Sequence, residues 1–309
     1  MSVQARTRRR RLGATAVTLA IAILAVTGAA ALPAGAATSG VHPGAGTVHA
    51  VSATAQRGTR AFWTRSRMAA ATPVTGNRAG GQVGPPPQIP DPTRFDGVPT
   101  VGALFFTTGT DAHFCTASVV NSLTANLILT AAHCVYGSTY ASNIAFVPMY
   151  HHGQRPYGAW PVESITVAAG WRRSHNQNLD FAFLTVAPPA GTHQPIQFVT
   201  GGLWLGIDQG FAHPIEVIGY NNTGDGPIGC ATASFQVAPR QMKFYCHDFQ
   251  DGTSGGPWIL GYRPSNGTGT VFGVVGGHDE GGNYTHSSYS AYFGKLTLRL
   301  FLQAERQQA

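Results

Sequence analysis

Short apolar and β-branched runs recur along the chain from about Val98, and turn residues separate them. Runs of this length between Gly, Pro, Asn or Asp residues are typical of β-strands. One series precedes Pro188 and a second series follows it. We expect twelve strands, at residues 100–107, 114–120, 126–132, 143–149, 164–168, 181–186, 215–220, 231–237, 241–245, 258–260, 270–275 and 287–293.

The pattern predicts an all-β fold made of two sets of about six strands. No long amphipathic helix interrupts the strands, so the alternation of strand and helix that builds a parallel sheet is missing. Barrels and a sandwich both fit such a pattern. Only Lys295–Gln308 looks helical, with apolar positions followed by a polar tail.

Residues 37–96 have a different texture and are expected to be a leader or propeptide, largely irregular. They are rich in Ala, Gly, Thr and Pro and show no strand or helix period. Phe62, Trp63 and Met68 are exceptions that could dock on the folded part, and a disordered linker is the alternative. The remaining chain divides into residues 97–205 and 206–309, one for each set of strands.

Residues 1–36 are expected to be a secretory signal peptide. Five arginines precede an apolar run from Ala14 to Leu32, and the small residues Ala34, Gly35 and Ala36 follow as a cleavage site. A membrane anchor is the alternative for the same run. We expect a secreted, extracellular protein with no stable membrane association once the signal is removed. The sequence does not separate general secretory from twin-arginine export.

The formal charge of +7 belongs to the N-terminal part of the chain. Residues 97–309 contain 9 Lys and Arg against 11 Asp and Glu, a net charge of −2. The folded part therefore has no basic surplus for phosphate backbones, and no nucleic-acid partner is expected.

The chain has four cysteines, at positions 115, 134, 230 and 246. An even number in an exported protein favours two disulfides, and three connectivities are possible. Pairing of neighbours, Cys115–Cys134 and Cys230–Cys246, is the simplest. A structural zinc site is the alternative, but there is no CxxC pair, and we expect no metal.

A serine among glycines, in residues 251–258, is the first candidate for chemistry. Gly252 and Gly255 can adopt positive φ and hold the hydroxyl of Ser254 at the tip of a tight loop. The N–H groups of Gly252 and Ser254 could then form an oxyanion hole. The alternative is a glycine-rich hairpin loop with an incidental serine.

His133 and Asp180 are the candidate partners of Ser254. His133 ends an apolar strand, and Asp180 opens another. A serine hydroxyl is a weak nucleophile that needs a base, histidine is the usual base, and a buried carboxylate orients the imidazole. Each of the two residues alone would more often be structural.

Together these motifs resemble chymotrypsin-like serine proteases. Thr-Ala-Ala-His-Cys at 130–134 and Thr-Ser-Gly-Gly-Pro at 253–257 match the family's His and Ser motifs, in the family's order His133, Asp180, Ser254. The chain is closest in character to secreted bacterial trypsin-like and glutamyl-endopeptidase-like peptidases. The resemblance covers about residues 98–303.

The resemblance implies two six-stranded antiparallel β-barrels with the site between them, and a disulfide from Cys115 beside the histidine. It implies a secreted enzyme, made as a zymogen, that works as a monomeric serine endopeptidase on protein or peptide substrates, without a cofactor. A catalytically inactive binding module on the same fold is the competing reading, but it predicts loss of a triad residue. All three are present.

Two features concern activation and specificity. Thr253 occupies the position where the animal enzymes have an Asp that pairs with the new N-terminus, so we expect no such ion pair. Asp248, Gly276 and Gly277 are the candidate substrate-binding residues by position. By the resemblance, Asp248 would favour cleavage after Arg or Lys. One alternative is a structural loop carboxylate, and another is that His247 and His278 favour an acidic side chain; the sequence does not select one.

Overall fold

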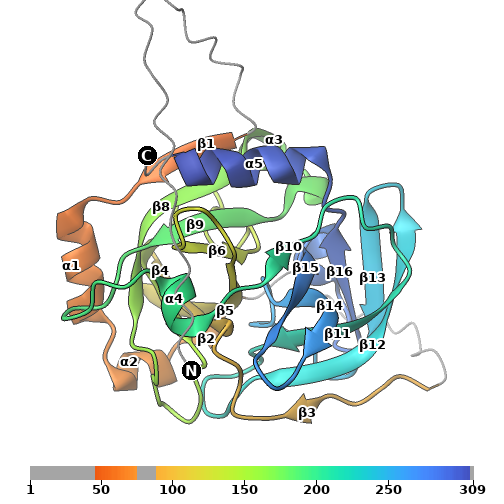
Figure 1. Ribbon diagram of the computed structural model, residues 1–309, viewed down its shortest axis with the longest axis horizontal. Coiled ribbons are helices and arrows are strands. Elements are labelled where there is room, and N and C mark those ends of the chain that lie inside the picture. Colours follow the sequence, from red (N-terminus) through yellow and green to blue (C-terminus); the bar gives the residue numbers. More distant parts are fainter. Residues whose placement is uncertain (1–45, 75–87, 307–309) are drawn as a thin grey trace, which may run out of the picture. The chain divides into compact units, whose positions relative to one another are not determined.

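Each of the twelve expected strands is present, because each apolar run buries side chains in a β-sheet. The structure is a computed structural model (Figure 1) that describes residues 46–74 and 88–306. The predicted signal peptide, residues 1–36, lies outside the described residues, as do 37–45, 75–87 and 307–309. The described residues fall within one compact unit, His42–Ala309.

The first barrel is built from the strands of the first series. They follow the order β8-β7-β4-β5-β6-β9, and an additional antiparallel pairing of β8 with β9 closes the ring. The bounds are β4 Val101–Thr108, β5 Asp111–Val120, β6 Leu127–Thr130, β7 Ser142–Pro148, β8 Trp160–Ala168 and β9 Ala182–Val186.

The second series forms a sheet in the order β15-β14-β11-β12-β13-β16. Its two end strands are joined beyond β15, where the N–H of Gly276 donates to the carbonyl of Tyr289 at 2.9 Å. The bounds are β11 His213–Gly219, β12 Ile228–Ala238, β13 Gln241–Tyr245, β14 Pro257–Arg263, β15 Thr268–Val274 and β16 Ser287–Ala291. The predicted all-β, chymotrypsin-like architecture is confirmed.

We expected antiparallel pairing throughout, but two of the strand pairs are parallel. Two short strands pair in parallel: β2 (Thr72–Pro73) with β5, and β10 (Trp204–Leu205) with β15. Both are only two residues long: β2 lies off the main strand order of its sheet, and β10 lies at the end of its own, beside β15. The strand β10 also joins the second sheet although it precedes the boundary expected at residue 206.

Three buried clusters hold the described fold together. The largest fills the first barrel and continues into the second through residues such as Ile218 and Val274. A second cluster, around Trp258 and Phe244, fills the rest of the second barrel. The third lies under residues 62–71 and includes Phe105, Phe114 and Tyr220.

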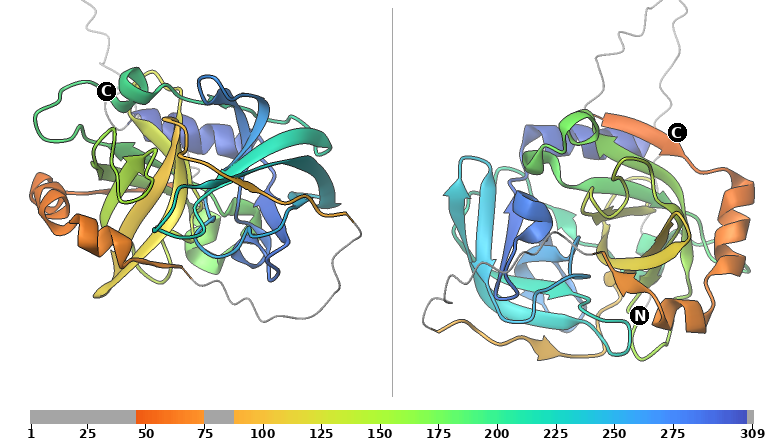
Figure 2. Two further views of the ribbon diagram at one scale, coloured as in Figure 1. Left: turned by 90° about the horizontal axis from the view of Figure 1, so that it is seen from below. Right: turned by 180° about the vertical axis from the view of Figure 1, so that it is seen from behind.

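The expectation that residues 37–96 are largely irregular is wrong for their described part. They form β1 (Gly46–Ala50), α1 (Ala53–Phe62), α2 (Arg65–Ala69), β2 and β3 (Thr93–Arg94). The elements are too short to show a period, and they depend on tertiary contacts: β1 pairs with β8, and β3 pairs with β12. Helices α1 and α2 lie against the outside of the first barrel (Figure 2).

The expected C-terminal helix is confirmed, but it is accompanied by short helices that the sequence did not predict. Helix α5 (Lys295–Glu305) is present, but α1, α2, α3 (Ala169–Ser174) and α4 (Ile196–Thr200) are helical too, each too short for a periodic signal. Helix α5 was expected with the second set of strands, yet it packs on β8 and β9 of the first barrel (Figure 1). Within the described residues, no helix has the length and apolarity needed to cross a membrane.

Candidate active site

The structure brings His133 and Asp180 together at one edge of the first barrel. Strands β6 and β9 pair antiparallel with Thr130 opposite Ala182, so the residues just after β6 and just before β9 meet. The carboxylate of Asp180 accepts the backbone N–H of His133 at 2.9 Å through Oδ1. Its Oδ2 lies 2.8 Å from Nδ1 of the His133 ring.

The Asp180 carboxylate is fully buried and has a third donor. The N–H of Gly277 donates to its Oδ2 at 2.9 Å. An acceptor held by two backbone N–H groups cannot turn away from the ring, and it favours the imidazole tautomer with its proton on Nδ1. In that tautomer Nε2 carries the lone pair and can accept a proton.

Ser254 lies in the tight loop between β13 and β14, and its side chain is almost completely buried. The loop requires its glycines. Gly252 has φ +91° and Gly255 has φ +81°. A Cβ on Gly255 would lie 2.1 Å from the carbonyl oxygen of Thr116, and a Cβ on Gly252 would lie 2.4 Å from the ring of Phe114.

Strand β5 supports this loop from the first barrel. The N–H of Thr116 donates to the carbonyl of Ser254 at 2.7 Å, and its hydroxyl donates to the carbonyl of Gly252 at 3.0 Å. The same hydroxyl accepts the N–H of Tyr220 at 2.9 Å. No sequence signal indicated this role, because Thr116 is one of many threonines in strands and its partners lie more than 100 residues away.

Two N–H groups of the loop remain available to a substrate. The N–H of Thr253 donates to Gln250, and that of Gly255 donates to Val275. In the part of the chain that the structure describes, the N–H groups of Gly252 and Ser254 have no acceptor. They are the two donors expected from the sequence to form an oxyanion hole.

Both disulfides join the neighbouring cysteines. Cys115–Cys134 connects β5 to the residue after His133, and Cys230–Cys246 connects β12 to the residue after β13. Cys115, Cys134 and His133 lie close enough to share a metal ion, but a disulfide leaves neither sulfur as a thiolate ligand. The first bridge instead ties the strand under the Ser254 loop to the His133 turn.

The expected substrate-binding residues do not form one group. Gly276 and Gly277 lie beside Asp180: a Cβ on Gly276 would be 3.0 Å from Oδ2 of that carboxylate. Asp248 is exposed on the Ser254 loop with φ +60°, and its carbonyl accepts the Asn221 side chain at 3.3 Å. Its role in side-chain preference stays a prediction.

Thr253, beside Ser254, is fully buried, and its hydroxyl donates to the carbonyl of Gln250 at 2.7 Å. A Cβ on Gly219 would lie 2.8 Å from Cβ of Thr253, so the residue is packed against β11. A neutral, internally bonded threonine cannot form an ion pair with a chain terminus. Other contacts must therefore order the loop.

The fold is shared with solved proteases at low sequence identity. A protease, Anisep, from Arthrobacter nicotinovorans superposes with a TM-score of 0.62 at 24% identity, over 70% of this chain and 99% of that one. A thermostable serine protease, AL20, from an extremophilic microorganism gives 0.60 at 24% identity, over 67% and 97%. A Glu endopeptidase gives 0.54 at 17% identity, over 71% and 98%.

Sequence comparison gives the family. No curated protein sequence matches the chain. The family model described as Trypsin matches residues 91–295, which is more than half of the chain and includes His133, Asp180 and Ser254. The chain therefore belongs to the trypsin family of serine endopeptidases.

Proposed function

We propose that the protein is a secreted endopeptidase that hydrolyses peptide bonds through an acyl-enzyme on Ser254. The observation that carries the proposal is the buried Asp180 carboxylate bonded to both the backbone N–H and Nδ1 of His133. Burying an ionised carboxylate costs free energy unless the carboxylate is hydrogen-bonded and paired with another group. Here it fixes the ring that is to act as the base.

In the first half of the reaction, Nε2 of His133 takes the proton of the Ser254 hydroxyl as its Oγ attacks the substrate carbonyl carbon. The C=O electron pair moves to oxygen, where the N–H groups of Gly252 and Ser254 stabilise the negative charge. Asp180 stabilises the imidazolium. His133 then donates the proton to the departing amine as the C–N bond breaks, which leaves an ester on Ser254.

In the second half, water replaces the amine. His133 accepts a proton from the water as its oxygen attacks the ester, and returns it to Oγ of Ser254 when the acid product leaves. Every step uses groups of this chain and water, so the proposal requires no cofactor.

Export is the second part of the proposal. It rests on the signal-like residues 1–36 and is supported by the two disulfides, which persist outside the reducing cytosol. The family acts on proteins or peptides, and the folded part has no basic surplus for a nucleic acid. A single copy contains the whole proposed triad, so we propose a working monomer.

Labelling with a fluorophosphonate probe tests the nucleophile. We expect the folded wild type to be labelled on the peptide that contains Ser254, and Ser254→Ala to be neither labelled nor active. The matched control is Ser118→Ala, a buried serine of β5 that lies outside the loop; it should keep both properties. Equal labelling of wild type and Ser254→Ala would contradict the proposal. A folded wild type that is not labelled would favour a binding module.

A further inference from the structure

Residues 46–74, which we call the strap, run along the first barrel as β1, α1, α2 and β2. The family match begins only at residue 91, so the strap is an addition to the family fold. From sequence it was expected to be leader. Its contacts indicate that it has a role in the working protein.

The strap is anchored at its start on the edge of the first barrel. Strand β1 pairs with β8 over five residues, from Gly46 opposite Ala168 to Ala50 opposite Ser164. The side chain of Gln303 in α5 makes two hydrogen bonds to the backbone of Gly46, at 3.0 and 2.9 Å. A Cβ on Gly46 would clash with Leu300, so β1 is tightly enclosed.

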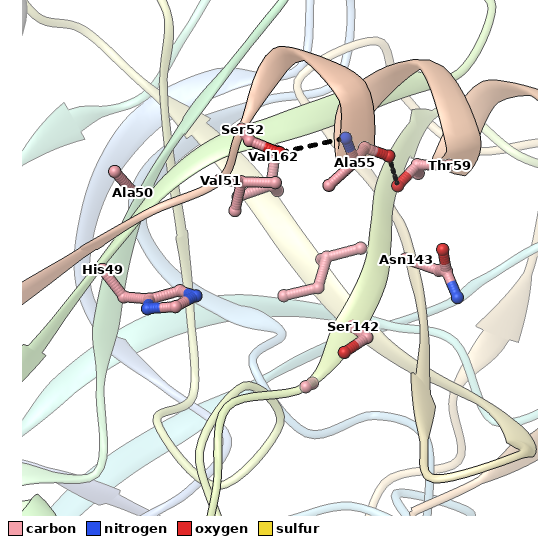
Figure 3. Close-up of a pocket in the computed structure, with 11 residues that line it drawn as sticks. His49, Ala50, Val51, Ser52, Ala55, Thr59, Ser142, Asn143 and Val162 are labelled. Carbon is pink, nitrogen blue, oxygen red and sulfur yellow. Dashed lines mark hydrogen bonds between the residues drawn. The ribbon is translucent and has the colours of Figure 1, made fainter.

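The middle of the strap is packed less tightly. A pocket of about 340 Å³ lies between the start of α1 and β7, lined by residues such as Ala55, Thr59 and Ser142. Figure 3 shows these residues around it. The hydroxyl of Thr59 donates to the carbonyl of Ala55 within the helix. The start of helix α1 therefore leaves space above the barrel, and the strap is tightly packed again from Trp63, just after α1.

The end of the strap is buried in the third cluster. Met68 is completely buried, and Trp63 is 2% exposed. The Trp63 ring lies 5.3 Å from Phe105, Phe105 lies 5.1 Å from Tyr150, and Tyr150 lies 6.4 Å from Tyr220, each measured between ring centroids. This aromatic series leads from the strap to Tyr220.

Tyr220 and Phe114, both in this cluster, form the surface against which Gly252 is packed. A Cβ on Gly252 would lie 2.4 Å from the Phe114 ring and 2.7 Å from the Tyr220 carbonyl oxygen. Gly252 supplies one of the two proposed oxyanion donors. Phe114 and Tyr220 thus fix the backbone position of that donor.

The strap also bonds directly to the elements that carry this surface. Strand β2 pairs with β5 at His113 and Phe114, and the N–H of Val74 donates to the Phe114 carbonyl at 3.4 Å. The hydroxyl of Thr223, three residues after Tyr220, donates to the carbonyl of Ala69 at 3.0 Å.

We propose that the strap is a permanent part of the active enzyme and that Met68 and Trp63 are positioning residues, which hold Phe114 and Tyr220 against Gly252. In this role the strap supplies the loop order that Thr253 cannot obtain from an N-terminal ion pair. A preorganised donor stabilises the oxyanion only if its position is fixed. The inference rests on the proposed function.

The test compares Met68→Ala with Leu300→Ala in the purified protein. Both remove a completely buried side chain, but Leu300 belongs to the largest cluster and anchors the other end of the strap. Activity towards a peptide substrate is divided by the number of active sites found by titration, which removes the effect of unfolded molecules. We expect Met68→Ala to lower kcat per site about 10-fold or more with little change in KM.

Three further results belong to the expected outcome. Leu300→Ala should lower Tm as much as Met68→Ala does, but it should keep kcat per site. Met68→Leu should keep kcat because it preserves the side-chain volume. A peptide aldehyde, which binds as a tetrahedral adduct, should lose more affinity for Met68→Ala than a product-like peptide does. If Met68→Ala fails to fold, Thr223→Val gives the same test, with about a threefold fall in kcat expected from the loss of its part-buried hydrogen bond to Ala69.

Unchanged kcat per site in Met68→Ala, or an equal fall in Leu300→Ala, would overturn the positioning role while leaving the triad intact. Failure of the proposed function has a different result: a folded wild type that neither turns over peptide nor reacts with a fluorophosphonate. In that case the inference falls with the function.

Discussion

At the scale of single residues, the site depends on one buried carboxylate that accepts three hydrogen bonds. The motifs around His133 and Ser254 could be read from the sequence, because each has a specific set of neighbours. Asp180 could be proposed from its place before an apolar strand and its order in the chain. Its third donor, Gly277, could not, because the two lie 97 positions apart and glycine carries no side-chain signal.

Asp180→Asn tests the carboxylate. An amide has one acceptor atom, so it cannot accept both backbone N–H groups and also the ring proton; its NH₂ group would face one of these donors or favour the other imidazole tautomer. We expect kcat to fall about 10³- to 10⁴-fold with retained folding, measured by peptide hydrolysis and circular dichroism.

The control for this variant is Asp279→Asn. Asp279 lies close to the same region, where its carboxylate accepts Gln177 and Asn283, but it is partly exposed and does not contact His133. It should keep kcat within about threefold, the size of an exposed polar contact. A similar loss in both variants would mean that Asp180 acts through local structure alone.

At the scale of elements, β5 carries more of the site than any motif suggests. It bonds the Ser254 loop through Thr116, places Phe114 against Gly252, and holds the disulfide that leads to His133. The sequence predicted β5 as a strand, since its apolar run is clear. It could not predict which of its residues face the second barrel, because that depends on how two sheets far apart in sequence meet.

Thr116→Val tests this support. Valine keeps the shape but leaves the Gly252 carbonyl and the Tyr220 N–H without their shared partner. Unpaired buried groups cost about 1–3 kcal/mol, so we expect a loss of that size in urea unfolding, and a lower kcat. Ser118→Ala is the matched change on the same strand, where the buried hydroxyl has no hydrogen-bond partner in the described residues. It should be nearly neutral, and an equal cost for both would contradict the role of Thr116.

At the scale of the whole molecule, the sequence separated the charged N-terminal part from a nearly neutral fold. It did not predict that residues 46–74 and 88–96 would form strands and helices that pack on the barrels. Their short elements have little intrinsic preference, and they are stabilised by the edges and grooves they cover. The segment around β3 also covers Glu216, in a pocket of about 370 Å³ lined in part by Asp91, Phe95 and Tyr262.

Burial raises the pKa of Glu216 to about 7, against an ordinary value of 4.5. The folded state therefore holds this proton more tightly than the unfolded state. Its contribution to stability is complete below pH 4.5 and is lost as the pH rises through 7. Because Glu216 is only half-buried, we expect the loss to be about 1 kcal/mol.

Glu216→Gln checks this effect in thermal melts between pH 4.5 and 8. The variant cannot ionise, so its Tm should fall less than that of the wild type as the pH rises, and the difference should grow most between pH 5 and 7.5. Parallel pH profiles for the two proteins would show that Glu216 does not ionise with the raised pKa. Glu163→Gln, which replaces a glutamate of β8 in the first barrel, provides the comparison.

The most direct test of the central claim is the identification of the acyl-enzyme itself. The protein is mixed with an activated ester of a peptide acid, quenched in acid within the first turnover, and digested for mass spectrometry. The account predicts one acyl group per active molecule on the peptide that contains Ser254, and none in Ser254→Ala. Two results would contradict it. One is an acyl group on another residue. The other is turnover by the wild type with no acyl group trapped, under conditions where Asp180→Asn turns over as fast as the wild type.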